Sequence, residues 1–149
     1  MSYIVDASVA VKWFVIEPHR DKARALLLAH GGDLEAPDFL LLELANIVWK
    51  KVRLGQIEQG NAFPILADTR EFITRFHPGD SLLDRALEIA LALDHPVYAC
   101  LYLACAELSG RTLITDDRRL AGAVRGTALE GQVELLADAA FAGPEGDLH

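Results

Sequence analysis

The sequence predicts an α/β fold: a three-layer α/β/α sandwich with a mostly parallel central sheet. Short runs of β-branched and apolar residues alternate with longer segments that carry apolar residues at helical spacing. This alternation is typical of parallel strands joined by helical crossovers, with helices on both faces of the sheet. At 149 residues, 52% of them hydrophobic, the chain can fill one sizeable core. We therefore expect a single domain over residues 1–149, with a loose tail at 143–149.

The predicted strands are short and end at polar residues. The first ends on Asp6, the only charged residue before Lys12, and Ser8 is expected to cap the helical turn that follows. Chemistry in an open parallel sheet sits at the carboxyl ends of its strands, so Asp6 lies where a site is expected. The predicted strands cover 3–5, 34–36, 111–115 and 133–136.

The predicted helices are bounded by capping residues, Gly and Pro. Asp38 is expected to cap the strongest of them, and Ser81 with Asp84 has the spacing of a capping box. Residues 77–80 are predicted as a turn. The segment 56–74 stays undecided, because Gly and Pro interrupt its helical pattern. The predicted helices cover 8–14, 20–29, 39–53, 81–93, 96–108 and 118–124.

Composition and charge narrow the class of protein. The net charge of −8 argues against a general nucleic-acid coat, which would be basic. It leaves room for an enzyme that cuts nucleic acid through bound metal ions, because these reverse the local field. We expect no membrane span and no secretory signal. Cys100 and Cys105 lie in one apolar run and are expected to be reduced, which favours a cytoplasmic protein.

Acidic residues in apolar surroundings mark the candidate site. Glu43 is the only charge between Phe39 and Trp49, and its helical neighbours are apolar. Because a lone buried carboxylate is costly unless it is paired or bound to metal, Glu43 is either a metal ligand or the partner of an arginine elsewhere. Asn46 lies one turn on and is expected to orient the Glu43 carboxylate.

Two further acids follow the strand at 111–115. Asp117 follows it as Asp6 follows the first strand, and the adjacent Asp116 is an alternative ligand or helix cap. Ser8 and Thr115 offer hydroxyl groups beside these acids. Acids from two strand ends and one helix would form an oxygen-lined cluster that suits Mg²⁺ or Mn²⁺.

Blander explanations of the acids stay open at this stage. Asp6 alone can be an Asx turn that leaves a strand. A phosphoacceptor receiver domain also gathers acids at strand ends, but its chemistry needs a lysine from a late strand. The lysines here are Lys12, Lys22, Lys50 and Lys51, all in the first half of the chain. We therefore rank the receiver interpretation low.

Four stretches occur in order at suitable spacing: Ile4-Val5-Asp6-Ala7-Ser8, Glu43 with Asn46, Val97 to Ala104, and Leu113 to Leu120. Together they resemble a PIN-domain ribonuclease of the VapC toxin type, over nearly the whole chain to about Leu136. The resemblance implies a PIN-like sandwich, Mg²⁺ or Mn²⁺, a homodimer and a cognate VapB-like antitoxin. It also implies an endoribonuclease toxin of a type II toxin–antitoxin system, which hydrolyses RNA to leave a 3′-hydroxyl and a 5′-phosphate. By position, Asp6, Glu43 and Asp117 match the family's acids.

One acid of the family pattern is missing. Similar proteins carry Asp after the tyrosine, where this chain has Ala99, and residues 96–106 hold no charge. Either this chain is an inactive form, engineered or natural, or Asp116 substitutes. On a helix that begins at Pro96, residue 99 would lie in the first turn, and its side chain would point toward the carboxyl edge of the sheet.

Three arginines follow the last acids. Arg118, Arg119 and Arg125 are candidates for contacts with RNA phosphates, and a solvated helix face explains each of them equally well. A second function from another class also remains: a catalytically inactive PIN-like module that binds antitoxin or RNA without cutting it. Ala99 favours that alternative for the chain as written.

Overall fold

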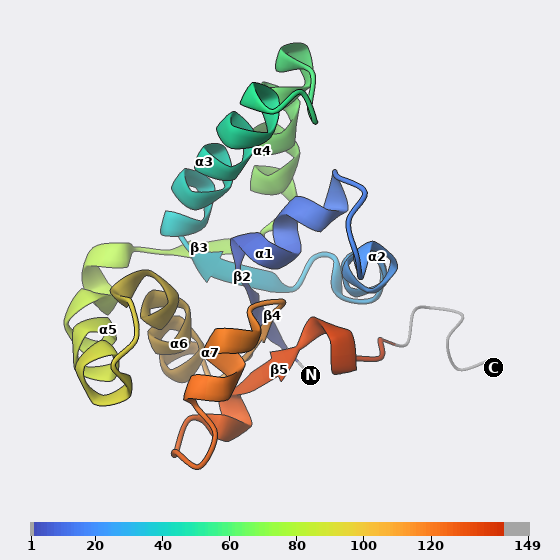
Figure 1. Cartoon of the computed structure of the whole chain (residues 1–149). Helices are drawn as coiled ribbons and strands as arrows, with labels where there is room; N and C mark the ends of the chain where they lie inside the picture. Colours follow the sequence, from blue (N-terminus) through green and yellow to red (C-terminus); the bar gives the residue numbers. More distant parts are fainter. Residues whose placement is uncertain (1, 142–149) are drawn as a thin grey trace.

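The computed structural model describes residues 2–141, in which a five-stranded, fully parallel sheet lies between two layers of helices (Figure 1). The spatial order of the strands is β3-β2-β1-β4-β5, so β1 is central. The strands are β1 (Tyr3–Val5), β2 (Leu34–Pro37), β3 (Arg75–His77), β4 (Thr112–Thr115) and β5 (Val133–Leu135). This arrangement confirms the predicted α/β/α sandwich with its parallel sheet.

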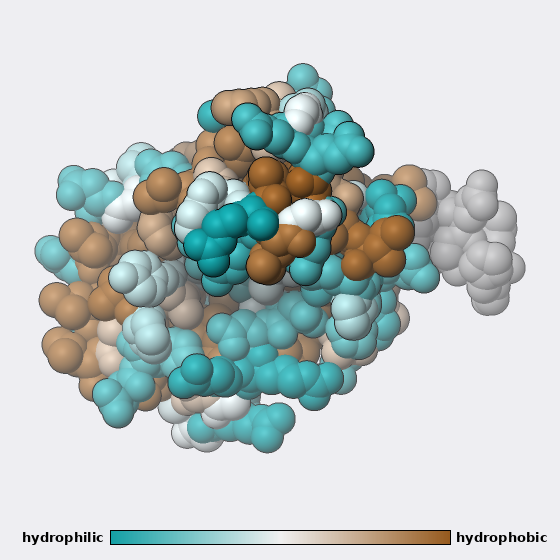
Figure 2. All heavy atoms as spheres, turned by 45° about the horizontal axis from the view of Figure 1, so that its top comes forward, coloured by the Kyte–Doolittle hydropathy of each residue, from teal (hydrophilic) through white to brown (hydrophobic). Residues whose placement is uncertain are grey.

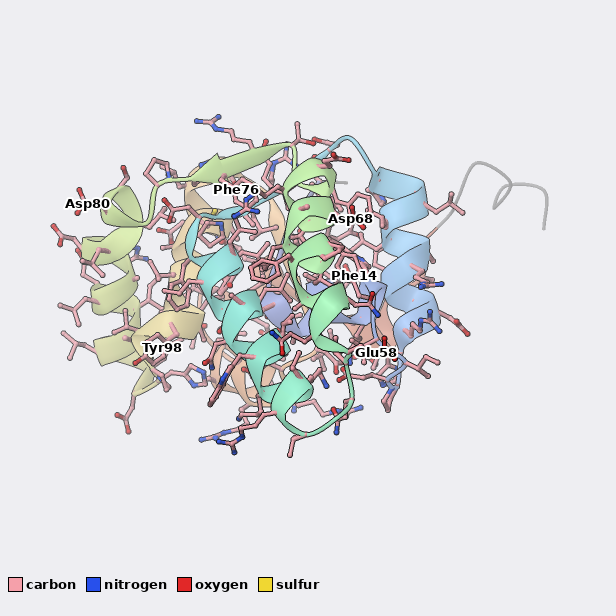
Figure 3. The ribbon with its side chains drawn as sticks, turned by 90° about the horizontal axis from the view of Figure 1, so that it is seen from above. Phe14, Glu58, Asp68, Phe76, Asp80 and Tyr98 are labelled. Carbon is pink, nitrogen blue, oxygen red and sulfur yellow. The ribbon has the colours of Figure 1, made fainter. Side chains whose placement is uncertain are left out.

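The helices divide between the two faces of the sheet. α1, α2, α3 and α4 lie on one side, and α5, α6 and α7 on the other (Figure 1). Seen from above, α3 and α4 lie side by side over α1 (Figure 3). The helices are α1 (Ala7–Ala10), η1 (Val11–Trp13), α2 (Arg20–His30), α3 (Phe39–Arg53), η2 (Gln59–Asn61), α4 (Ala62–Phe72), α5 (Gly79–Leu93), α6 (Val97–Ser109), α7 (Arg118–Ala123), η3 (Glu130–Gln132) and η4 (Leu136–Asp138).

Two elements differ from the sequence prediction. The undecided segment at 56–74 contains α4, which packs against α3 and carries Phe72 onto the ring of Phe14, with 6.2 Å between ring centroids. β3 was missed, and its last residue was assigned to a turn. This strand has three residues at the sheet edge, with an exposed Arg75 and a buried His77, so it offers little apolar pattern to read.

Three predicted helix caps are wrong. Asp6, and not Ser8, caps α1: its carboxylate accepts a hydrogen bond from the backbone of Val9. Asp38 precedes α3 as predicted, but its carboxylate accepts a hydrogen bond from the Gly79 backbone at 3.0 Å. α5 begins at Gly79, which puts Ser81 and Asp84 inside the helix and removes the predicted capping box.

The main core lies between the sheet and α6. Residues 100–106 of α6 are all buried, and α6 packs against β1, β2 and β4. Gly110 ends this helix in the left-handed conformation, at φ 67°, where residues with a side chain are strained. α6 is therefore fixed along its length, and its first turn is held at the carboxyl edge of the sheet.

Among the described residues, no single helix is long and apolar enough to cross a membrane; α5 and α6 meet that test only as a pair bent by 116°. The predicted loose tail at 143–149 lies outside the described residues.

Both thiols should be free and protected in the native protein. Cys100 and Cys105 are fully buried, and burial raises the pKa of Cys100 to about 11 and that of Cys105 to about 12. We expect a chromogenic thiol reagent at pH 8 to react slowly with the folded protein and to count two thiols per chain after denaturation. A count of zero in denatured, unreduced protein would reveal a disulfide and contradict this structure.

Candidate active site

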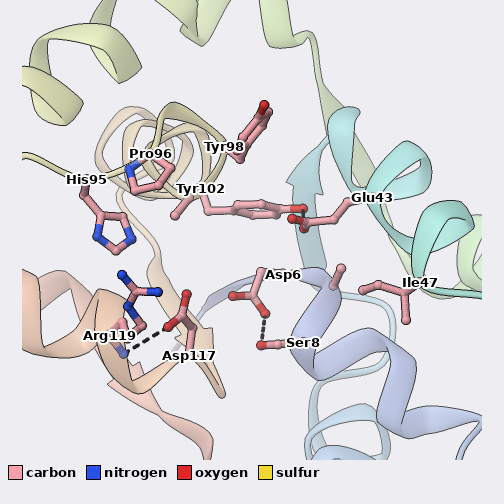
Figure 4. Close-up of a pocket in the computed structure, with 12 residues that line it drawn as sticks. Asp6, Ser8, Glu43, Ile47, His95, Pro96, Tyr98, Tyr102, Asp117 and Arg119 are labelled. Carbon is pink, nitrogen blue, oxygen red and sulfur yellow. Dashed lines mark hydrogen bonds between the residues drawn. The ribbon is translucent and has the colours of Figure 1, made fainter. Parts of the chain in front are cut away.

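A cavity of about 300 Å³ opens where the carboxyl ends of β1 and β4 meet the first turns of α3 and α6. Three carboxylates face it, from Asp6, Glu43 and Asp117, and Figure 4 shows these side chains pointing toward one another. The remaining lining residues are Ala7, Ser8, Ile47, His95, Pro96, Tyr98, Ala99, Tyr102 and Arg119. The structure thus brings together three acids that are far apart in the sequence.

Asp6 is the most enclosed of the three acids, with 6% of its surface exposed. It follows β1, and its carboxylate accepts hydrogen bonds from the hydroxyl groups of Ser8, at 2.6 Å, and Thr115. The backbone of Val9 donates a third hydrogen bond at 3.3 Å. The two hydroxyl groups named from the sequence therefore contact Asp6 directly.

The same hydroxyl groups fix the turn that follows β4. The backbone N–H of Asp116 donates to Ser8 Oγ at 2.9 Å, and that of Asp117 donates to Thr115 Oγ1 at 3.0 Å. Each hydroxyl group thus accepts a backbone hydrogen bond and donates its proton to Asp6. The network ties the end of β1 to the start of α7, so Asp6 and Asp117 are held as one unit.

The electrostatics of Asp6 reflect its enclosure. Burial raises the pKa of Asp6 to about 6, and the hydrogen bonds from Ser8 and Thr115 oppose that increase. The charge of Glu43 raises the pKa of Asp6 further. Asp6 and Glu43 therefore repel each other across the cavity when both are ionised.

Glu43 is half-buried on the first turns of α3, and its Oε1 accepts a hydrogen bond from the hydroxyl group of Tyr102 at 2.7 Å. Burial raises the pKa of Glu43, and the charge of Asp117 adds to this, while the hydrogen bonds from Tyr102 and the Ala7 backbone lower it. Asn46, predicted to orient Glu43, is exposed and outside the cavity lining. Its expected role is taken by Tyr102 on α6.

The tandem acids after β4 go to different places. Asp117 lines the cavity, and its Oδ1 caps α7 by accepting from the backbone of Arg119 at 3.0 Å and of Leu120 at 3.2 Å. Asp116 instead forms an ion pair with the buried Lys12, with 3.3 Å between Oδ2 and Nζ. Of the two acids, the sequence left open which faces the site, and the structure gives that position to Asp117.

Residues at the rim extend the site beyond the acids. Arg119 lines the cavity beside His95, whereas Arg118 and Arg125 are exposed and lie outside its lining (Figure 4). Tyr98, 63% exposed, stacks on Phe39 with ring centroids 5.9 Å apart. Of the three arginines named from the sequence, Arg119 alone is placed to contact a ligand in the cavity.

Ala99 lines the cavity from the first turn of α6, as the helix predicted from Pro96 requires. An acid at this position would face the same space as Asp6 and Asp117 and would lie at the positive end of the helix dipole. In this chain the position contributes a methyl group, so the cavity wall has no oxygen ligand there.

The donor set suits a hard divalent cation. Within residues 2–141, no three His, Cys, Asp or Glu side chains converge closely enough to hold an ion by themselves. Mg²⁺, however, usually takes one or two protein carboxylates and completes its shell with water and substrate phosphate. The mutual repulsion of Asp6, Glu43 and Asp117 would be relieved by a cation between them. The residues present therefore fit Mg²⁺ or Mn²⁺ held partly by water.

Sequence reasoning missed Tyr102, His95 and Lys12 as parts of this region. Tyr102 carried a readable signal: it lies three residues after Ala99, on the same side of a helix without charges. His95 precedes that helix and carries no comparable signal. Lys12 was noted as the first positive charge in the chain, but its contact with residue 116 depends on the packing of distant segments.

Comparison with known proteins adds an independent line. The model of the PIN domain matches residues 3–125. Ribonuclease VapC3 of Pyrobaculum aerophilum is 32% identical over 123 residues, which are 81% of this chain and 93% of that protein. Exonuclease VapC9 of the same organism is 29% identical over 127 residues, covering 85% of this chain and 88% of the relative. The crystal structure of PAE2754 from Pyrobaculum aerophilum superposes with a TM-score of 0.68 at 26% identity, covering 92% of this chain and 85% of the other.

The raised pKa of Asp6 makes this residue destabilising in the metal-free protein at neutral pH. Its folded value of about 6 exceeds the usual value of 3.8, so the folded state binds the proton more tightly than the unfolded state. Its contribution to stability is therefore greatest below pH 4 and is lost as the pH rises through 6. In the presence of a chelator, Asp6→Asn should raise the free energy of unfolding at pH 7.5 by up to about 3 kcal/mol, and by little at pH 4.

Thermal or urea unfolding at the two pH values measures this difference. Asn keeps the capping position of α1, so the comparison isolates the charge. Asp21→Asn, at an exposed position on α2, is the matched control and should leave the pH dependence unchanged. An equal effect of Asp6→Asn at both pH values would contradict the raised pKa.

Proposed function

This chain belongs to the PIN-domain family, and from that premise we propose that it is a metal-dependent endoribonuclease toxin of a type II toxin–antitoxin system, impaired by Ala99. The observation that carries the proposal is the cavity faced by Asp6, Glu43 and Asp117, within the matched residues. The relative named ribonuclease VapC3 supports RNA as the substrate and a toxin as the class of protein.

The proposed reaction is the hydrolysis of an RNA phosphodiester bond. Mg²⁺ or Mn²⁺, when bound, would act as a Lewis acid on the phosphate and lower the pKa of a water molecule. Asp6 and Glu43 would hold the ion, Asp6 fixed by two hydroxyl groups and Glu43 by Tyr102. In-line attack of water on phosphorus would leave a 3′-hydroxyl and a 5′-phosphate.

The remaining cavity residues have supporting roles in this proposal. Arg119 lines the cavity and would contact an RNA phosphate. Asp117 would add a carboxylate oxygen toward the ion. The pairing of Asp116 with Lys12 argues against the idea that Asp116 replaces the missing acid. Ala99 therefore leaves the site one oxygen donor short, and such a loss commonly weakens metal affinity by about 10- to 100-fold.

A second candidate function rests on the same observation. Without an acid at Ala99, the chain can act as a PIN-like module that binds antitoxin or RNA and does not cleave. The two candidates differ in one measurable respect, because the module predicts RNA binding without metal-dependent turnover.

The proposal includes partners and a location. We infer a cognate VapB-like antitoxin from the relatives named VapC, and a homodimer in solution. We also infer a cytoplasmic location, which the free, buried thiols support.

Restoring the acid at Ala99 tests the proposed reaction. Ala99→Asp should increase Mn²⁺-dependent cleavage of RNA by at least about 10-fold and make expression without antitoxin harmful to the host. A labelled linear RNA gives the rate and the 5′-phosphate ends, and a circular RNA separates endonucleolytic from exonucleolytic cleavage. Ala99→Asn is the matched control, since it has the same size without the charge.

Two further variants sharpen the assay. Glu43→Gln in the Ala99→Asp protein should abolish the gain, and Asp116→Ala in the original chain should change little. If the original chain is already a brisk metal-dependent nuclease and Asp116→Ala destroys that activity, the site is built around Asp116 and the role given to Ala99 is wrong.

Exposed apolar side chains underlie the dimer prediction. Leu83, Leu87 and Leu91 of α5 are 48–76% exposed and recur every four residues along one face of the helix. Figure 2 shows apolar side chains gathered on the side of the molecule where α5 lies. We expect light scattering to give twice the chain mass of 16.3 kDa at micromolar concentration. The mass of a single chain at all concentrations would overturn the dimer.

A further inference from the structure

Lys12 is a buried cation next to the candidate site. It lies in η1, directly after α1, and only 4% of its surface is exposed. Its ammonium group contacts Glu17 Oε1 at 3.1 Å and Asp116 Oδ2 at 3.3 Å. A buried ammonium is strongly unfavourable without partners, so both carboxylates are needed to keep Lys12 in this position.

The two carboxylates depend on Lys12 to different degrees. Glu17 has a second cation, because its Oε2 contacts Lys51 of α3 at 2.6 Å. Burial would raise the pKa of Glu17, but the hydrogen bonds and charges of Lys51 and Lys12 lower it below its usual value. Asp116 has one ion pair among those of the described residues, and its partner is Lys12. Loss of Lys12 would therefore leave Asp116, rather than Glu17, without a counter-charge.

The position of Asp116 matters because it adjoins Asp117. The backbone N–H groups of both residues are held by Ser8 and Thr115, so the turn itself is fixed. Its side chains still choose between the cavity and the protein interior. An unpaired Asp116 carboxylate beside Asp117 would add like charge to a cavity whose acids already repel one another.

We propose that Lys12 is a positioning residue of the carboxylate site: its ion pair holds Asp116 away from the cavity and thereby leaves Asp117 as the acid of this turn that faces a metal ion. This inference rests on the proposed function, since it concerns the same ion. Lys12 itself lies outside the cavity lining and acts through Asp116.

The test measures Mn²⁺ affinity of the full chain by electron paramagnetic resonance of the free ion, with no RNA present. Lys12→Met keeps the length of the side chain and removes its charge; it should weaken Mn²⁺ binding by about 10-fold. Lys51→Met is the matched control: it removes a cation from Glu17, leaves Asp116 paired, and should change the affinity less than twofold.

A second change separates positioning from a structural role. Lys12→Met combined with Asp116→Asn should recover most of the lost affinity, because the neutral amide no longer repels Asp117. Circular dichroism and the midpoint of thermal unfolding show whether each variant is folded. If a Lys12→Met variant unfolds, the Asp116→Asn single variant carries the test, and it should bind Mn²⁺ as tightly as the original chain.

The outcomes divide cleanly. Unchanged affinity in folded Lys12→Met, an equal loss in Lys51→Met, absence of recovery in the double variant, or a marked loss in Asp116→Asn alone would each overturn the role of Lys12 and leave the proposed function standing. If neither the original chain nor its Ala99→Asp variant binds Mn²⁺, the metal-dependent function fails first, and the positioning role fails with it.

Discussion

The buried carboxylate of Asp6 is the constraint on which the site depends. The parallel register pairs Val5 with Ile114, which puts the residues that follow, Asp6 and Thr115, side by side at the carboxyl edge. A charge that is 6% exposed must be hydrogen-bonded there, and the nearby hydroxyl groups meet that need. Their remaining hydrogen-bonding capacity fixes the β4–α7 turn. Core packing, strand register and site geometry are therefore one set of requirements.

Most of the fold was readable because its signals are local. β1, β4, α3 and α6 each combine an apolar run with a clear stop, and the observed elements begin and end within about two residues of the prediction. The caps were the weak point. Whether Asp38 caps its own helix or accepts from Gly79 depends on how the chain returns, which no local pattern encodes. β3 failed for a related reason, because an edge strand of three residues is defined by its neighbour β2 rather than by its own sequence.

The candidate site was predictable where chemistry contradicts its surroundings. Asp6 and Glu43 stand out as charges among apolar residues, and the structure brings both to one cavity. The partners of these acids were harder to infer. Tyr102 replaces Asn46 beside Glu43 because α6 crosses the sheet close to α3, and Lys12 takes Asp116 because η1 folds back under the β4–α7 turn. Contacts between distant segments decide such choices.

The two oxygens of Asp117 are divided between two tasks. Oδ1 takes both backbone donors at the start of α7, which leaves Oδ2 for the cavity. Replacing Asp117 by Ala would thus remove a helix cap together with the charge, and a silent protein would be ambiguous between a dead site and a frayed helix. Glu43 has no share in capping, so its amide is the cleaner knockout. In such a site, the choice of an inactivating substitution is a question of helix architecture as much as of chemistry.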